Sequence, residues 1–380
     1  MGPRAPPSRA SRLRWMAPLL ALGAMAALVP APAARVGRMA EGEAALGFDF
    51  GTSGARCAAI ASDGSMLCGE VSVRWAEGRE RSQTGADWVE ALHTLLGMVP
   101  ADVRARVSRI GVSGTSGTCL LCDATTREPS EWRGPPRMYD FNVAKQVAGD
   151  AGERAIELIG DAAPPLHVAR AGSSGLAKLV AWHFEDPLRP NEVHVPQLRV
   201  TMKSRASPAR AQAAPWFAVR KWLQCASSPS AMCTHPAFSS VAQVLAHQAE
   251  FVASQLLAPP EAGMPAFTSD WHNTLKTGFD VRDLQWPAWL TDPGTELGAI
   301  VAGRLPAVIP PGAPLGKASD EVVRRWGLRD GCLVCAGTTD SNAAFLASGA
   351  SEVGEYLDGL TVHPLHTLHT AYFRLRRSPG

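Results

Sequence analysis

The sequence predicts an α/β domain with a mixed sheet and helices on both faces, because two distant segments each place a small-residue turn after a buried strand. Residues 45–50 form a short apolar run, and Gly51 and Gly54 behind it allow the backbone to bend tightly. Residues 331–345 repeat this arrangement with a short apolar strand, a turn of small residues, Asp340, and an Ala-rich segment of helical character.

Further strands are expected close to the first one. Residues 56–60 and 66–73 continue it as a meander, with a tight turn at residues 62–64. Residues 109–113 and 118–122 are predicted to be neighbouring strands. This succession is typical of the opening of an actin-like ATPase domain, which runs strand, acidic Gly-Thr turn, strand, tight turn, strand.

Three segments are predicted to be helices. In residues 87–98, apolar side chains recur at helical spacing. They are Trp88, Leu92, Leu95 and Leu96. Residues 178–183 and 244–257 are the other two predicted helices, and we expect their apolar residues to belong to the core.

Asp49 and Asp340 are the residues that most directly indicate a function. The turn after Asp49 directs several N–H groups toward one point, which suits phosphate oxygens, and a carboxylate beside it suits the accompanying Mg²⁺. Asp340 stands at a strand's end before a helix, where it faces a cleft, and phosphoryl transfer needs a carboxylate to accept a hydroxyl proton. The alternatives are an ordinary hairpin at Asp49 and a helix N-cap at Asp340.

Six short stretches carry a resemblance to a known family. They read DFGTSGAR at 49–56, GVSGTSGT at 111–118, MYD at 138–140, SDWHNTLK at 269–276, GFDV at 278–281 and GTTDS at 337–341. Together and in this order they resemble the FGGY carbohydrate kinases, and within them the plant and cyanobacterial kinases described as D-ribulose or xylulose kinase-like. The resemblance covers most of residues 44–350 and implies the N-terminal domain of that family, with a ribonuclease H-like, actin-like ATPase fold.

The resemblance also implies roles for single residues. Asp340 would be the catalytic base, and Asp49 would be the Mg²⁺–phosphate residue. The cofactors would be ATP and Mg²⁺, with ATP phosphates near Gly51, Thr52, Ser53, Arg56, Thr338 and Thr339. The sugar pocket would be lined by Ser113, Gly114, Thr115, Ser116 and Asp140, with Asp270 nearby. Asp270 serves equally well as a loop or helix cap.

The implied activity is in-line attack of a terminal sugar hydroxyl on the γ-phosphate of ATP. We expect a ketopentose as substrate, D-ribulose first and D-xylulose as the alternative. The family continues after residue 350 into a second domain that carries most of the adenosine pocket, whereas residues 351–380 match nothing in it. A truncated kinase is therefore expected, and a non-catalytic sugar-binding or regulatory remnant is the second hypothesis. A different actin-like ATPase is the third, which residues 113–118 and 270–276 disfavour.

Two segments stand apart in composition. Residues 1–40 have no acidic residue and six arginines, so residues 1–43 are predicted to be a transit or signal peptide. The expected location is the chloroplast. The alternatives are the cytoplasm, or the secretory pathway if residues 16–29 form a signal sequence. Residues 187–243 interrupt the family pattern with a basic, Pro-containing insert. It is interpreted as a disordered surface loop, a basic docking arm or an unremoved intron.

The overall composition is that of a soluble globular chain. Hydrophobic residues make up 46% and charged residues 19%, and the net charge is +2. Such a small charge gives no indication of a nucleic-acid partner, and no stretch after the N-terminus is long and apolar enough to cross a membrane. A small-molecule sugar is the expected partner, and the sequence does not indicate an oligomeric state.

The Cys119/Cys122 and Cys332/Cys335 pairs bear on metal binding. Residues three apart in an extended strand point to opposite faces, so neither pair readily chelates one ion. We interpret all four cysteines as small core residues rather than as zinc ligands.

Overall fold

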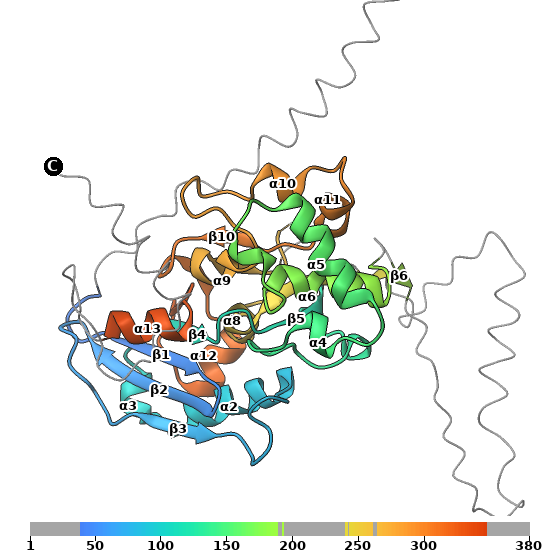
Figure 1. Cartoon of the computed structure of the whole chain (residues 1–380). Helices are drawn as coiled ribbons and strands as arrows, with labels where there is room; N and C mark the ends of the chain where they lie inside the picture. The colour runs from blue at the N-terminus through green and yellow to red at the C-terminus, as the bar shows by residue number, and fades with distance from the viewer. Residues whose placement is uncertain (1–38, 189–191, 194–239, 242, 261–263, 348–380) are drawn as a thin grey trace, which may run out of the picture.

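The computed structural model describes residues 39–188, 192–193, 240–241, 243–260 and 264–347 (Figure 1). Nearly all of the predicted transit or signal peptide, most of the basic insert and the tail at 351–380 lie outside the described residues. The two short strands that flank the insert, β6 (Glu192–Val193) and β7 (Ser240–Val241), pair with each other in antiparallel fashion.

A six-stranded mixed sheet organises the fold, in the order β11-β12-β4-β1-β2-β3. The central strand β1 runs antiparallel to β2 and parallel to β4, and β4 in turn runs parallel to β12. The edge strands β3 and β11 are antiparallel to their neighbours. The bounds are β1 Ala44–Phe50, β2 Gly54–Ala61, β3 Val71–Arg74, β4 Val107–Gly114, β11 Pro314–Lys317 and β12 Leu333–Cys335.

The predicted meander is confirmed, with one strand shorter than expected. Residues 66–73 were predicted to be a strand, but only Val71–Arg74 forms β3, and Met66 makes an isolated bridge to Ile60. Gly54 is required where β2 begins, because a Cβ there would lie 2.2 Å from the carbonyl oxygen of Val73. The close approach of β3 therefore explains this glycine.

Helices cover both faces of the sheet, as predicted. Alternate residues of β1 are buried, and Phe48 and Phe50 share one core with α2 (Gly85–Met98) and α8 (Gln248–Ser254). The predicted helix 87–98 is thus confirmed, and a capping box between Thr84 and Asp87 begins it. On the opposite face, α13 (Asp340–Ala347) contacts β1 and β4 (Figure 1).

A second core lies beside the sheet and is built mainly from helices. It includes α5 (Ala151–Ala162), α6 (Gly175–Glu185) and α11 (Glu296–Val301), so the predicted helix 178–183 is confirmed. The remaining elements are short. They are α3 Ala101–Arg104, η3 Glu131–Arg133, α4 Val143–Gln146, η4 Val168–Arg170, β9 Thr268–Asp270, α9 Trp271–Leu275, α10 Ala288–Thr291, β10 Ala307–Ile309 and α12 Asp320–Trp326.

Two sequence predictions about strands and helices are wrong. Residues 118–122 do not neighbour residues 109–113, because the turn through Gly117, with φ of 86°, leads the chain away from the sheet. The strand β5 (Cys119–Asp123) instead pairs with β8 (Gln243–His247). Residues 244–257 are not one helix, because their first residues form β8 and the helix starts only after a capping box between His247 and Glu250.

The strand β5 separates the two cores. Cys119 packs into the helical core, whereas Cys122 packs into the core under the sheet, which confirms that these side chains point to opposite faces. Burial raises the pKa of both thiols, that of Cys119 to about 11. Both cysteines therefore act as apolar core residues.

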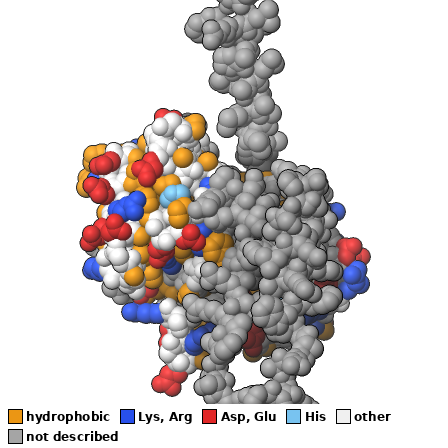
Figure 2. All heavy atoms as spheres, turned by 90° about the vertical axis from the view of Figure 1, so that its right-hand side faces the viewer, with side chains coloured by type: hydrophobic (Ala, Val, Ile, Leu, Met, Phe, Trp, Pro, Cys, Tyr) orange, Lys and Arg blue, Asp and Glu red, His pale blue; other side chains and the backbone are white. Residues whose placement is uncertain are grey.

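The described surface carries charges of both signs. On the face drawn in Figure 2, acidic and basic side chains are interspersed outside the grey region. Among the described residues, no helix is long and apolar enough to span a membrane.

The sheet core is expected to dominate stability. Leu92 is fully buried on α2, whereas Leu166 is 96% exposed, so one substitution can be compared at both sites. We expect Leu92→Ala to lower the free energy of unfolding by about 2–5 kcal/mol and Leu166→Ala to change it by less than about 0.5 kcal/mol. Urea unfolding measures both values, and equal losses would contradict the assigned core.

Candidate active site

Three parallel strands bring the predicted phosphate and base residues to one edge of the sheet. Asp49 near the end of β1 stands opposite Ser113 of β4. Beyond the strands, Gly114 and Thr339 form a parallel bridge, and the Gly114 N–H donates to the carbonyl oxygen of Thr338 at 3.4 Å. The turn that leads to Asp340 therefore lies directly beside the strand ends that carry Asp49.

The carboxylate of Asp49 is held by two neighbours. The hydroxyl of Ser113 donates to Asp49 Oδ1 at 3.0 Å, and Arg56 Nε lies 3.4 Å from Asp49 Oδ2. Burial raises the pKa of Asp49 above its ordinary value, although both partners act in the opposite direction. The Arg56 side chain is 55% exposed, so this ion pair contributes little to stability and leaves Arg56 accessible to an anion.

Asp340 is the first residue of α13, and its carboxylate lies within electrostatic reach of Asp49. The backbone N–H of Ser341 donates to Asp340 Oδ1 at 2.8 Å. Burial raises the pKa of Asp340, and the negative charge of Asp49 raises it further. Two carboxylates in one partly desolvated site repel each other, which is the electrostatic setting that a bound cation relieves.

The donor set fits Mg²⁺. Among residues 39–347 where described, no group of three or more His, Cys, Asp or Glu side chains could hold a metal ion by itself. Mg²⁺ is commonly bound by one or two carboxylates together with water and substrate phosphates. Asp49 and Asp340 match that requirement, and the predicted roles of both residues remain predictions.

The turn at residues 51–53 is fixed from several directions. The Gly51 N–H donates to Gly54 O at 2.9 Å, and Trp75 Nε1 donates to Gly51 O at 3.1 Å. Gln83 Nε2 donates to Thr52 O at 3.3 Å. The predicted tight turn is present, while phosphate binding by Gly51, Thr52 and Ser53 remains a prediction.

The loop at residues 114–118 is hydroxyl-rich and anchored by α8. Both the N–H and the hydroxyl of Thr115 donate to Gln248 Oε1 at 2.9 Å. The hydroxyls of Thr115 and Thr118 lie 2.5 Å apart. The Ser116 hydroxyl is buried and has no hydrogen-bond partner within the described part of the chain, which is uncommon for a buried polar group.

Asp140 and Asp270 differ in their surroundings. The Asp140 carboxylate lies 3.2 Å from Arg81 Nε, and both side chains are accessible to solvent. Asp270 is 2% exposed and caps α9, accepting from the N–H groups of His272 at 2.8 Å and Asn273 at 3.1 Å. Asp270 is therefore the N-cap of α9, which was the alternative role for this residue. Sugar binding by Asp140 and Asp270 remains a prediction.

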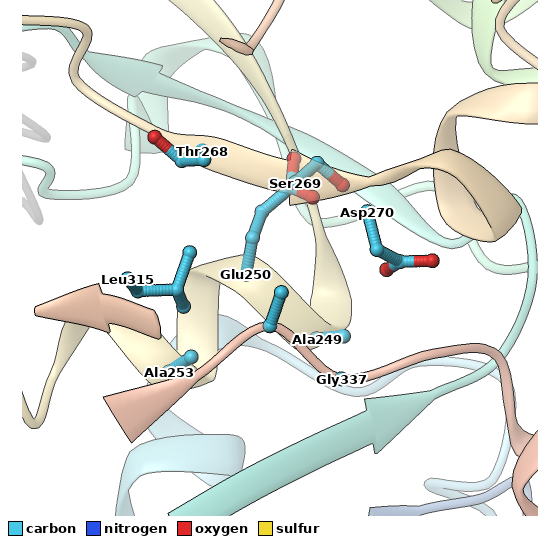
Figure 3. A pocket seen from close by; sticks show the side chains of 9 residues that line it. Ala249, Glu250, Ala253, Thr268, Ser269, Asp270, Leu315 and Gly337 are labelled. Carbon is cyan, nitrogen blue, oxygen red and sulfur yellow. The ribbon is translucent and has the colours of Figure 1, made fainter. Parts of the chain in front are cut away.

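A small cavity lies beside Asp270. Figure 3 shows Glu250 and Ser269 directed toward each other above Gly337, with the Asp270 carboxylate to one side. The cavity volume is about 10 Å³, close to what one water molecule needs. It is too small for a sugar.

Two residues that the sequence did not indicate connect the 269–276 stretch to the 114–118 loop and to the 337–340 turn. Lys276 Nζ donates to Ser116 O at 3.4 Å; burial lowers the Lys276 pKa, whereas the charge of Asp340 acts in the opposite direction. His272 Nε2 accepts from Trp271 Nε1 at 3.2 Å, so Nδ1 carries the proton and donates to Thr338 Oγ1 at 2.7 Å. Both belong to the 269–276 stretch, but only their tertiary neighbours reveal these contacts.

Comparisons with known proteins agree on the fold. No protein-family profile matches the sequence. The structure is similar to that of xylulose kinase from Rhodospirillum rubrum, with 16% identity, a TM-score of 0.51, and coverage of 82% of this chain and 53% of that chain. It is also similar to that of Plasmodium falciparum glycerol kinase with ADP, with 11% identity, a TM-score of 0.50, and coverage of 80% and 49%.

At such identities the similarity establishes the fold alone. The chain spans about half the length of the solved structures that it matches. The predicted fold is confirmed: the chain has the ribonuclease H-like, actin-like ATPase fold of the sugar kinases.

The 337–340 turn leaves no room for a side chain at Gly337. A Cβ there would lie 1.6 Å from the carbonyl oxygen of Val112, whereas a Cβ at Gly69 would meet nothing within 4 Å. We expect Gly337→Ala to lower the free energy of unfolding by about 1–3 kcal/mol because β12 must move away from β4. Gly69→Ala is the matched control in urea unfolding, and equal stabilities would contradict this packing.

Asp270 gives the stability a pH dependence of known sign. Burial raises the pKa of Asp270 from 3.8 to about 6, so the folded state binds more protons than the unfolded state between these values. Relative to Asp270→Asn, the free energy of unfolding should fall by about 1.4 kcal/mol per pH unit from pH ~4 to ~6. Urea titrations of both proteins across this range measure the difference, and a constant difference would be inconsistent with a buried, ionising Asp270.

Proposed function

We propose that this chain is the sugar-binding and catalytic-base part of an ATP-dependent carbohydrate kinase that phosphorylates a ketopentose at a terminal hydroxyl. D-Ribulose is the first choice of substrate and D-xylulose the second. The observation that carries the proposal is the approach of the Asp49 and Asp340 carboxylates at one sheet edge, beside a hydroxyl-rich loop.

Asp340 suits the role of general base. Its raised pKa makes it a stronger proton acceptor than an exposed carboxylate, while Lys276 opposes that rise and favours the ionised form. Asp340 would accept the proton of the attacking hydroxyl. Its carboxylate is fixed by the Ser341 N–H, which restricts the direction from which that hydroxyl can approach.

Asp49, with Asp340 close by, would hold the magnesium of Mg·ATP. When bound, Mg²⁺ neutralises negative charge on the phosphates. Arg56 lies beside Asp49 with an exposed side chain and would pair with a phosphate oxygen. The turn at residues 51–53 directly follows the end of β1, and its remaining backbone N–H groups would bind phosphate oxygens.

The sugar would be recognised by the loop at residues 114–118 and by Asp140. A polyol needs several donors and acceptors at fixed positions. The buried Ser116 hydroxyl and the accessible Asp140 carboxylate supply such groups. A ketopentose offers hydroxyl groups that can satisfy both.

Substitution of the proposed base tests this function. Asp340→Asn keeps the size of the side chain and removes the proton acceptor, so the rate of ADP release with D-ribulose should fall about 10²–10⁴-fold. Asp161→Asn, an exposed change on α5, should leave the rate unchanged. A coupled ADP assay with D-ribulose and D-xylulose measures both variants.

The assay is run on this chain and on a version extended from the genomic sequence, because the matching kinases are about twice as long. Near-normal turnover by Asp340→Asn in a form that is active would exclude Asp340 as the base. Binding of a ketopentose without turnover in either form would favour the non-catalytic sugar-binding alternative.

A further inference from the structure

Lys178 is a fully buried lysine in the first half of α6. Its exposure is 0%, and its neighbours Leu176, Leu179 and Val180 are equally buried in the helical core. Removing an amine from water costs free energy unless its hydrogens find acceptors. A leucine or methionine would pack there without that cost, so the amine needs a specific explanation.

The Lys178 amine joins two segments that are separate in the sequence. Its Nζ donates to the carbonyl oxygen of Gly117 at 2.7 Å and to that of Met138 at 2.7 Å. Gly117 lies in the loop at residues 114–118, and Met138 stands two residues before Asp140. Arg137 Nη1 donates in return to the Lys178 carbonyl oxygen at 3.1 Å, so α6 and the second segment are tied in both directions.

These bonds do not depend on the charge of the amine. Burial lowers the pKa of Lys178 to about 8, and the Asp140 carboxylate acts weakly in the opposite direction. An ammonium group has three hydrogens and a neutral amine has two. Two carbonyl oxygens are therefore satisfied in either state, and the link persists across neutral pH.

We propose that Lys178 is a positioning residue that holds the 114–118 loop and the 138–140 segment at the spacing that a sugar requires. The inference rests on the proposed function, because these two segments carry the groups assigned to sugar recognition. Lys178 itself touches no substrate. A displacement of about 1 Å at such a site can cost about 10²-fold in rate, so loss of this single buried donor between the two segments is expected to impair the site.

The test replaces the amine while keeping the stem. Lys178→Met removes both donors at nearly constant length, and Leu179→Met is the matched control, because it changes the adjacent buried core residue while keeping the Lys178 amine. Amide hydrogen exchange of peptides covering residues 114–118 and 138–141 reports on the loops. Titration calorimetry with D-ribulose and D-xylulose reports on sugar affinity, and urea unfolding reports on global stability.

We expect faster exchange in both peptides of Lys178→Met and a roughly 10–100-fold weaker sugar affinity, because each carbonyl oxygen left without its donor favours displacement of its segment. Leu179→Met should stay close to the unmodified chain. Exchange that is unchanged, or faster in only one peptide, would overturn the link between the loops. Faster exchange with undiminished sugar affinity would overturn the positioning role. If Lys178→Met does not fold, Lys178→Leu, which also removes the amine, is judged by the same criteria.

Failure of the proposed function would look different. If the unmodified chain binds neither ketopentose, the proposed function is contradicted. The exchange data alone then decide whether Lys178 links the two loops.

Discussion

The parallel pairing of β4 with both β1 and β12 is the constraint on which the rest of the structure depends. Parallel strands end at the same edge of a sheet, so this pairing gathers Asp49, Ser113 and the turn before Asp340 from distant parts of the chain. A shift of one residue in register would turn Asp49 into the core and Phe48 out of it. The hydrogen bond from the Ser113 hydroxyl to the Asp49 carboxylate forms only in the observed register.

Burial and charge give this edge of the sheet its chemical character. Desolvation raises the pKa of Asp49 and Asp340, and it lowers the pKa of Lys276 beside them. Groups whose pKa values are displaced in this way are suited to proton transfer and to binding of charged ligands. Each carboxylate disfavours ionisation of the other. A bound cation or the nearby lysine favours the ionised forms.

The sheet and its two acids could be predicted from sequence because each rests on a local signal. An apolar run followed by glycine marks β1, and apolar spacing with a capping box marks α2. The strand β8 could not be predicted, because a short apolar run does not distinguish a strand from a buried helix and only its pairing with β5 decides. Lys178 and Lys276 were missed for the same reason: their carbonyl partners come from other segments.

The most direct measurement is a crystal structure of the chain, or of its extended form, with a ketopentose and Mg²⁺ bound to a non-hydrolysable ATP analogue. We predict that the terminal sugar hydroxyl lies within about 2.6–3.2 Å of an Asp340 carboxylate oxygen, with the Mg²⁺ on the Asp49 side of the same site. A sugar bound away from the 337–340 turn, or a metal–phosphate site remote from Asp49, would contradict the proposed phosphotransferase function.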